Sequence, residues 1–366
     1  MPVFILADHI VSPLGEGTAA NFRQVTAGVS GIRRHEAGPV SARPFYASLF
    51  EAAEPTAPLT RFETILISAI DGALKDSNID PSDPETVLIL STTKGNIQLL
   101  ETNPYNDALR DRISLSTSAR LVAEYFGFTT KPIVVSNACI SGVLAITTGA
   151  RLLRAGKYKH AVIVGGDIVS RFILSGFESF QAVSPEPCRP FDAARSGITL
   201  GEGAAAMVLS TRPAHIEVLG GSIGNDANHI SGPSRTGQEL AHVIRQALGT
   251  ERIDFISAHG TATPYNDEME AKAVTLAGLG SVPIHSLKGY YGHTFGAAGL
   301  IESILSVQSL REDCLIPSMG FEHLGVSEPI HVIQDVIRTP LQYCLKTASG
   351  FGGCNAAVVF GKSAAV

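Results

Sequence analysis

One cysteine of this chain lies where a thiol can act as a nucleophile. Cys139 follows the apolar run from Ile133 to Val135 and directly precedes a segment that is predicted to be helical from Gly142 to Arg154. At such a strand-to-helix turn, free backbone N–H groups and the positive end of the helix dipole favour a thiolate, and the same amides can bind an oxyanion. By position alone, Cys139 is equally compatible with a small, inert residue of the core.

Two histidines and a lysine lie in later polar and glycine-rich blocks. His259 follows a predicted strand at Ile253 to Ile256, and His293 comes five positions after Lys288, just before a predicted helix from Ala297 to Leu310. A histidine at the end of a strand is well placed to face a cleft, but a single one is more often a hydrogen-bonded structural residue. Each block therefore becomes informative only together with the others.

A phosphate loop and a zinc site are alternative interpretations of these blocks. The segment from Leu287 to Gly299 contains neither G-x-G-x-x-G after a strand nor G-x-x-x-x-G-K-[ST], so it does not predict a phosphate loop. Cys139, His259 and His293 lack the local spacing that is typical of zinc ligands. We therefore expect no metal.

The composition is typical of a compact α/β enzyme that works in a reducing compartment. The chain has 366 residues, of which 45% are hydrophobic and 17% charged, so it can bury a large core. A net charge of −6 without a long Lys/Arg cluster argues against nucleic acid as a partner. Five cysteines without a C-x-x-C pair argue against a disulfide framework and favour the cytoplasm. We expect neither a secretory signal nor a membrane span, since no apolar stretch approaches roughly 20 residues.

Predicted strands and helices alternate along the chain, as in a layered α/β fold. Strands are predicted at Val87 to Leu90, Ile133 to Val135, Val162 to Val164, Ile253 to Ile256 and Ala356 to Phe360. Helices are predicted at Arg61 to Lys75, Gly142 to Arg154, Gly237 to Leu248, Asp267 to Ala277 and Ala297 to Leu310. A Pro-marked loop is expected at Ala52 to Pro58. The segments beginning at Pro132 and Pro283 both run from a strand through a small-residue turn into a Gly/Ala-rich helix, which suggests an internal duplication.

Five blocks of residues match those of a known family in residue type and in order along the chain. They are Ala138-Cys139-x-Ser141-Gly142, Phe191-Asp192 with Arg195-Ser196-Gly197 and Leu200-Gly201-Glu202-Gly203-Ala204, His259-Gly260-Thr261-x-Thr263 with Asp267 and Glu270, Lys288-x-x-x-Gly292-His293-x-x-Gly296-Ala297-Ala298-Gly299, and Gly350-Phe351-Gly352-Gly353-x-Asn355. Over nearly its whole length the chain resembles the elongating β-ketoacyl-[acyl carrier protein] synthases of the thiolase superfamily. The resemblance implies an α/β, thiolase-like fold of five αβαβα layers, made of two duplicated halves. We place the half with the nucleophile at 1–211 and the half with the catalytic histidines at 212–366.

The resemblance implies a decarboxylative Claisen condensation. Cys139 would take an acyl group from an acyl carrier protein, with the amides of Cys139 and Phe351 as the oxyanion hole. His259 and His293 would stabilise the enolate that malonyl carrier protein leaves on losing its carboxylate. The product is a fatty acid, polyene or polyketide chain longer by two carbons, and no dissociable cofactor is implied. A histidine at position 293, rather than Asn, marks the decarboxylating members of the family.

Supporting roles follow from the same resemblance. Lys288 would order the network of histidines and carboxylates, with Asp267, Glu270 and Glu302 as its structural supports and ion partners. Thr261, Thr263 and Ser349 would border the substrate site beside Phe351. Ser349 stands where many members carry a second Phe, and Ile140 stands where a small or hydroxyl residue is common. We therefore expect a wider entrance beside Phe351 and a pocket that differs from housekeeping enzymes.

The implied partners are acyl carrier protein, in its acyl and malonyl forms, and a second copy of this chain. A heterodimer with a related subunit is the alternative. Two other functions stay open: a non-catalytic subunit like the chain-length factors, and a thiolase-type acyltransferase that uses coenzyme A. Chain-length factors generally lack the nucleophile, and thiolases carry a second active-site Cys. The presence of Cys139, His259, His293 and Lys288 together favours an active synthase.

Overall fold

The computed structural model describes residues 1–51 and 58–364 of the chain. Apart from Pro58, the loop predicted at 52–58 therefore lies outside the described residues. No helix among the residues described is long and apolar enough to cross a membrane.

Two sheets of the same design form the framework of the fold. The first has the order β1 (Phe4–Ser12), β9 (Gly203–Ser210), β7 (His160–Asp167), β5 (Thr86–Ser91) and β6 (Ile133–Val135). The second has the order β10 (Ile216–Asn225), β17 (Cys354–Lys362), β16 (Tyr343–Gly350), β11 (Phe255–Ser257), β12 (Pro283–His285) and β14 (His331–Val332). In each sheet the second strand is antiparallel to both of its neighbours, and the strands beyond it run parallel. This repeated pattern is the expected duplication.

The two sheets meet edge to edge and are joined into one continuous ladder. Strands β1 and β10 pair through Phe4 with Glu217 and Ile5 with Ile216. Short strands lie outside this ladder or at its margin: β2 (Gly15–Glu16), β3 (Arg33–His35), β4 (Phe45–Ser48), β8 (Leu200–Gly201), β13 (Cys314–Leu315) and β15 (Ile337–Arg338).

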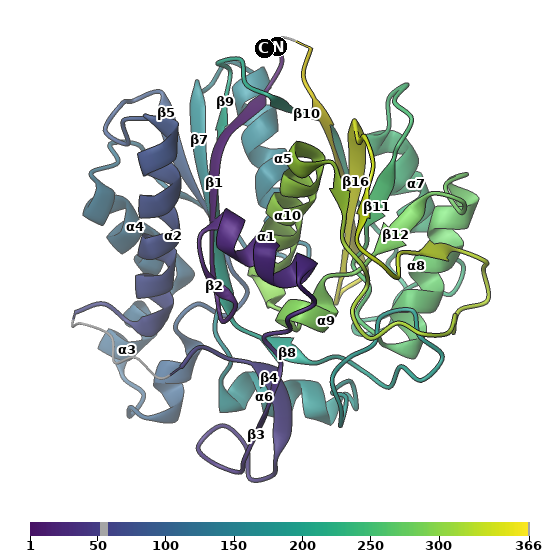
Figure 1. Ribbon diagram of the computed structural model, residues 1–366. Helices are drawn as coiled ribbons and strands as arrows, with labels where there is room; N and C mark the ends of the chain where they lie inside the picture. The colour runs from purple at the N-terminus through teal and green to yellow at the C-terminus, as the bar shows by residue number, and fades with distance from the viewer. Residues whose placement is uncertain (52–57, 365–366) are drawn as a thin grey trace.

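Helices form three layers around the two sheets (Figure 1). One outer face is covered by α2 (Arg61–Ser77) and α4 (Leu115–Phe126), and the other by α7 (Gln238–Ala247) and α8 (Pro264–Leu276). Between the sheets lie α5 (Ser141–Arg154) and α10 (Ala298–Glu312), which contact each other. The prediction of a five-layered αβαβα fold is confirmed. The remaining helices are α1 (Thr18–Thr26), η1 (Ile97–Glu101), α3 (Asp107–Arg112), α6 (Arg171–Ser179), α9 (Lys288–Tyr291) and η2 (Phe295–Ala297).

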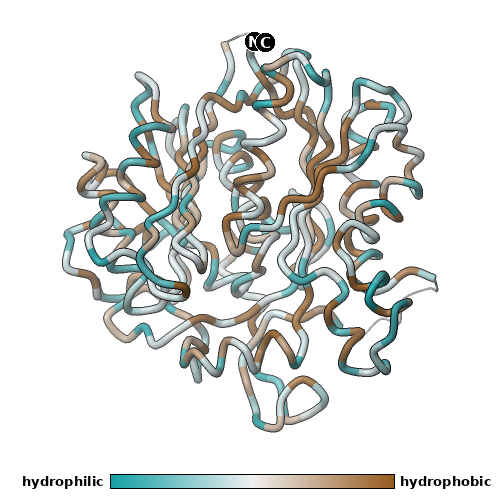
Figure 2. The backbone as a smooth tube through the Cα atoms, turned by 180° about the vertical axis from the view of Figure 1, so that it is seen from behind, coloured by the Kyte–Doolittle hydropathy of each residue, from teal (hydrophilic) through white to brown (hydrophobic). Residues whose placement is uncertain are grey.

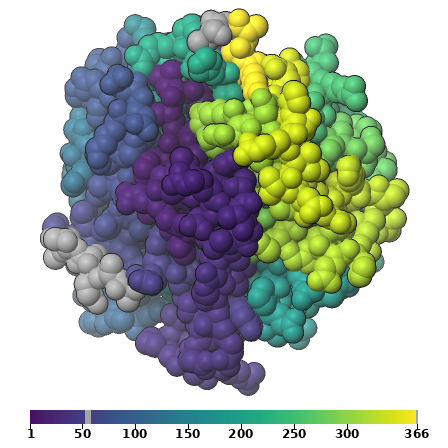
Figure 3. Space-filling model, viewed as in Figure 1, coloured from purple at the N-terminus to yellow at the C-terminus, as the bar shows by residue number. Residues whose placement is uncertain are grey.

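The hydrophobic core follows these layers. Apolar segments run through the strands and the helices between them, whereas the outer loops are mostly polar (Figure 2). On one face the N-terminal segment lies across the boundary between the two halves, and α1 packs on α10 there (Figure 3). The middle layer is thus enclosed from several sides.

Glycines explain how closely the two central helices approach. A Cβ atom at Gly142 would lie 2.5 Å from the backbone nitrogen of Leu300, and one at Gly299 would lie 2.9 Å from the backbone nitrogen of Val143. Because each contact involves backbone, a larger side chain at either position would force α5 and α10 apart. Since Cys139 lies at the start of α5 and His293 just before α10, this contact positions both.

Every predicted strand and helix corresponds to an observed element, with shifts at some ends. The strand predicted from Ile253 begins at Phe255. Helix α8 begins at Pro264, three residues before the prediction, because the Thr263 side chain accepts a hydrogen bond from the amide of Asn266 and proline occupies the first turn. Strand β9 was not predicted, since its sequence, GAAAMVLS, contains three alanines, which have low strand propensity.

Candidate active site

The turn that carries Cys139 is held by a serine of the following helix. Ser141 Oγ accepts a hydrogen bond from the Asn137 amide at 2.8 Å and donates one to the Ala138 carbonyl at 2.7 Å. Ala138 has a φ of 44°, in the left-handed region, which produces the sharp reversal between β6 and α5. Cys139 is 8% exposed and lines a cavity of about 770 Å³. The thiol is therefore buried in the wall but reaches the open space.

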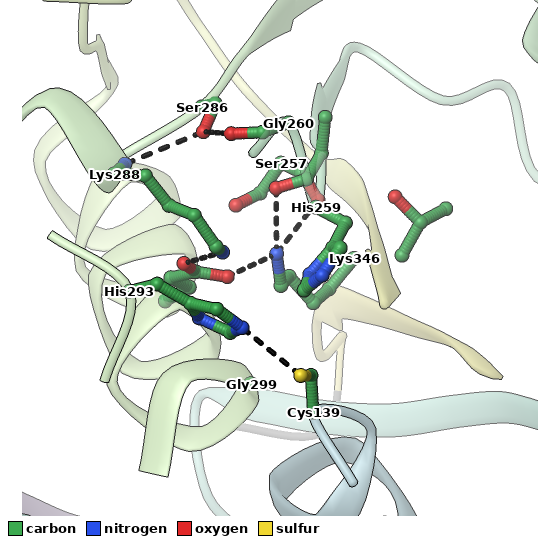
Figure 4. Close-up of polar contacts among 12 residues, drawn as sticks. Cys139, Ser257, His259, Gly260, Ser286, Lys288, His293, Gly299 and Lys346 are labelled. Carbon is green, nitrogen blue, oxygen red and sulfur yellow. Dashed lines mark hydrogen bonds and ion pairs between the residues drawn. The ribbon is translucent and has the colours of Figure 1, made fainter. Parts of the chain in front are cut away.

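His293 and His259 lie next to this thiol (Figure 4). His293 Nε2 is 3.0 Å from Cys139 Sγ, and the ring centroids of the two histidines are 5.3 Å apart with an interplanar angle of 82°. Both rings are buried, and both residues line the same cavity as Cys139. The three residues predicted from separate parts of the chain thus form one cluster.

A carboxylate beneath His259 holds the turn on which it lies. Glu270 accepts hydrogen bonds from the amides of His259, at 2.8 Å, and Gly260, at 2.7 Å. Thr347 Oγ1 donates to Glu270 at 2.6 Å. The turn is fixed between β16 and α8, so the imidazole of His259 is presented from a rigid backbone.

Asp267 also binds backbone rather than lysine. Its carboxylate accepts from the amides of Phe191 at 2.7 Å and Ala262 at 3.2 Å. The expectation that Asp267 and Glu270 are ion partners of Lys288 is therefore wrong. The start of α8 places both carboxylates under the preceding turn, whose free amides they satisfy.

Behind the histidines lies a buried ion cluster. Lys288 Nζ and Lys346 Nζ each lie 2.6 Å from an oxygen of Glu302, and all three side chains are at most 5% exposed. The pairing of Lys288 with Glu302 is thus the expected one. Lys346, on β16, is a residue that the sequence analysis missed. The only sequence signal is a lysine within an otherwise uncharged strand, YCLKTASG.

Burial and the two lysines control the protonation of the cluster. Burial, followed by the charge of Lys288, lowers the pKa of both histidines well below its usual value, and Lys346 adds to the effect. Burial raises the pKa of Cys139 to about 11, although the charge of Lys288 and a hydrogen bond from the Phe351 amide oppose it. The thiolate expected at the helix terminus is thus opposed by burial. At neutral pH the resting site holds a thiol beside neutral imidazoles.

The end of β16 forms the opposite wall of the site. Gly350 passes so close to the nucleophile that a Cβ atom there would lie 3.0 Å from the Cys139 amide nitrogen. The ring of Phe351 contacts those of Phe177, at a tilt of 32°, and Phe180, edge to face, with 5.5 Å between centroids in both cases. Because a hydrogen bond from the Phe351 amide lowers the pKa of the Cys139 thiol, this amide is a candidate to bind an acyl oxygen on that sulfur.

The residues expected to border the substrate do line this cavity. They are Thr261, Thr263, Ser349 and Phe351. The hydroxyls of Thr261 and Thr263 lie 3.0 Å apart, and Ser349 Oγ donates to Asn355 at 2.8 Å. Ser349 is thus tied to the start of β17, which follows the turn at Phe351.

Geometry alone leaves a metal as an alternative occupant of the cluster, since one donor atom from each of Cys139, His259 and His293 lies within 4.8 Å of the others. The surrounding charge argues against it. Lys288 and Lys346 lower the pKa of both histidines through their positive charge, and the same potential repels a divalent cation. The donor set fits a nucleophile with a base better than a metal site.

Comparison with known proteins gives the family. The chain matches the profile of the β-ketoacyl synthase N-terminal domain over residues 1–215 and that of the β-ketoacyl synthase C-terminal domain over residues 215–322. It is 29% identical to 3-oxoacyl-[acyl-carrier-protein] synthase 2 of Vibrio cholerae, covering 98% of both chains. It is 33% identical to a putative polyketide β-ketoacyl synthase 1 of Streptomyces cyaneus, over 69% of this chain and 65% of the relative.

A solved structure, the ishigamide ketosynthase/chain length factor, has the same fold. It superimposes with a TM-score of 0.88 at 26% identity, covering 99% of each chain. The profile matches end at residue 322, so Lys346 and Phe351 lie beyond them. Together with the Cys-His-His cluster, these matches establish that the chain belongs to the β-ketoacyl synthase family.

Proposed function

We propose that Cys139 carries the growing acyl chain and that His259 and His293 serve the condensation with a malonyl group. The reaction of the family, chain elongation by decarboxylative condensation, requires a thiol nucleophile and donors for an enolate. The contact of 3.0 Å between Cys139 Sγ and His293 Nε2, inside a cavity that His259 also lines, is the observation that carries this assignment.

In the first step the thiol attacks the acyl thioester of the carrier protein. Because burial holds Cys139 protonated, His293 Nε2 accepts the proton as sulfur attacks. The Sγ–acyl carbon bond forms, the bond to the carrier thiol breaks, and the proton passes to that leaving thiol. The amides of Cys139 and Phe351 bind the oxyanion in between.

In the second step malonyl carrier protein loses carbon dioxide. The electrons of the broken C–C bond form an enolate, whose oxygen accepts hydrogen bonds from the imidazole N–H groups of His259 and of His293, which for this step takes the tautomer protonated on Nε2. The enolate carbon attacks the acyl carbonyl on Cys139, the bond between that carbonyl and Cys139 Sγ breaks, and the sulfur takes up a proton from solvent. The product is a β-ketoacyl thioester on the carrier protein, longer by two carbons.

We also propose that the chain pairs with a second copy along β6. This strand ends the ladder and, within the described residues, pairs only with β5. It leads directly into the turn of Cys139, so a partner there would lie close to the acyl site. A heterodimer is the alternative, because a ketosynthase/chain length factor has the same fold. A concentration-independent monomer by sedimentation at micromolar protein would contradict both.

We place the protein in the cytoplasm, where its cysteines would stay reduced. All five are free in the structure. Fractionation of expressing cells would test this placement.

Intact-protein mass spectrometry with a panel of acyl carrier protein thioesters tests the central assignment. We expect one acyl adduct on the wild type and on Cys314→Ala, whose cysteine lies in β13, and none on Cys139→Ala. The preferred chain length would indicate the pathway, whether fatty acid, polyene or polyketide. An adduct that persists on Cys139→Ala would overturn the assignment of the nucleophile. If the wild type takes no acyl group, the result would favour a non-catalytic partner subunit instead.

A further inference from the structure

Lys346 is held by three acceptors in the interior of the protein. Its side chain is fully buried, and its Nζ lies 2.6 Å from Glu302, 3.2 Å from the Ser257 carbonyl and 2.9 Å from the Ala258 carbonyl (Figure 4). The two carbonyls accept hydrogen bonds from Nζ, and the adjacent carboxylate of Glu302 favours the ammonium form, against the burial that lowers the pKa of Lys346. Lys346 is therefore a buried cation.

One lysine would be enough to neutralise Glu302, so the positive charge of Lys346 is in excess. Glu302 is already paired with Lys288, so two ammonium groups share one carboxylate and the cluster carries a net positive charge. Burying a charge is unfavourable unless it is compensated, and an apolar residue would fit a central strand at lower cost. We therefore look for the role of this second buried cation in the adjacent active site.

The carbonyls that Lys346 binds belong to the backbone just before His259. Ser257 ends β11 and Ala258 follows it, so the ammonium holds this backbone from one side. The next residue of β16, Thr347, donates to Glu270, which in turn binds the amides of His259 and Gly260. Successive residues of β16 thus fix both sides of the turn that presents His259.

We propose that Lys346 is a positioning residue of the condensation site: it fixes the backbone of His259 and supplies positive charge behind the two histidines, where negative charge develops. The inference rests on the proposed roles of His259 and His293. Negative charge appears on the enolate and on the acyl oxyanion, and a fixed cation in a dry environment stabilises both.

The charged and titratable groups that interact with Lys346 lie on four neighbouring elements. Lys346 interacts with Glu302 of α10, Lys288 of α9, Glu270 of α8 and His285 of β12. The charges of Lys288 and Lys346 lower the pKa of His293. The pKa of His259 is lowered by these two lysines and by His293. Removing the charge of Lys346 should raise the pKa of both histidines, because one of the two cations that oppose their protonation is lost.

Two substitutions separate charge from position. Lys346→Met keeps most of the volume and removes both the charge and the donors, whereas Lys346→Gln removes the charge but retains an amide donor. Leu345→Met, at the adjacent buried position of β16, is the matched control. Each variant is assayed for carbon dioxide release from malonyl carrier protein, and for acylation of Cys139 by intact mass between pH 5 and 9.

For both Lys346 variants we expect carbon dioxide release to fall by about 10²-fold, as when one oxyanion donor is lost elsewhere. The acid limb of acylation should move to higher pH, because without the charge of Lys346 His293 would stay protonated, and unable to accept the thiol proton, up to a higher pH. Leu345→Met should resemble the wild type. If Lys346→Met does not fold, Lys346→Gln still tests whether the charge of Lys346 contributes to the reaction.

Two results would overturn the inference. A Lys346→Gln protein with the rate and pH profile of Leu345→Met would show that the buried charge has no part in the reaction. A lower rate with an unchanged acid limb would reduce Lys346 to a packing residue. His293→Ala distinguishes this from failure of the proposed function: if that variant also releases carbon dioxide at the wild-type rate, the assignment of the histidines is wrong as well.

Discussion

Removal of the His293 imidazole should slow acylation of Cys139 by an amount that depends on pH. Burial raises the pKa of the Cys139 thiol to about 11. A thiol with that pKa and no base would be ionised in about one molecule in 10⁴ at pH 7. Since His293 Nε2 lies 3.0 Å from the sulfur, it is the group placed to accept the proton during attack.

We expect His293→Ala to lower the acylation rate at pH 7 by about 10²–10⁴-fold, the range that a positioned base contributes. Below the pKa of the thiol, the thiolate fraction rises about tenfold per pH unit. The variant should therefore recover by about tenfold for each unit between pH 7 and pH 9. The wild type should change far less, because the lowered pKa of His293 keeps its imidazole neutral throughout this range.

The assay is time-resolved intact mass after mixing with an acyl carrier protein thioester, for wild type, His293→Ala and His259→Ala. The second variant is the matched control, because it removes an imidazole from the same cavity whose ring centroid lies 5.3 Å from that of His293. It should slow acylation by less than about tenfold while reducing carbon dioxide release. Acylation of His293→Ala at the wild-type rate, or without dependence on pH, would refute the reasoning.

Three further predictions follow from the same structure. Cys139→Ala should form no acyl adduct yet still release carbon dioxide from malonyl carrier protein, and loss of that release would give the thiol a part in decarboxylation. Ser349→Phe should shorten the range of acyl chains accepted, because Ser349 lines the cavity beside Phe351, and an unchanged chain-length profile would contradict this. Burial raises the pKa of Asp267 to about 6, so the folded chain holds this proton more tightly than the unfolded chain. The free energy of unfolding should therefore fall as pH rises from about 4 to about 6, and urea unfolding of Asp267→Asn should show a flatter dependence.

Local patterns were sufficient to predict the elements that carry the chemistry. The helix after Cys139 and the helix after His293 begin within one residue of their predicted starts, because small residues and apolar periodicity mark both. Strand β9 was missed because its alanines give no strand signal, although it pairs with strands on both sides. Tertiary pairing there overrides local propensity.

The contacts within the site were predictable only through the resemblance to a family. No spacing in the sequence shows that Cys139 and His293, 154 positions apart, meet at hydrogen-bonding distance. Nor does it show that Glu270 would bind backbone amides, since a buried carboxylate near a lysine more readily suggests an ion pair. Lys346 was missed for the same reason, because its acceptors come from α10 and the end of β11.

The duplication explains why the site forms where it does. In each half, a parallel strand, β6 or β12, precedes the helix of the middle layer, α5 or α10; a turn joins β6 to α5, whereas α9 and η2 lie between β12 and α10. The turn after β6 provides Cys139, and the turn after α9 provides His293. Because glycines let α5 and α10 approach to backbone contact, the two turns face each other across the same cavity. We propose that the boundary of the halves lies between β9 and β10, at 211/212, so that neither half alone has both the nucleophile and its base.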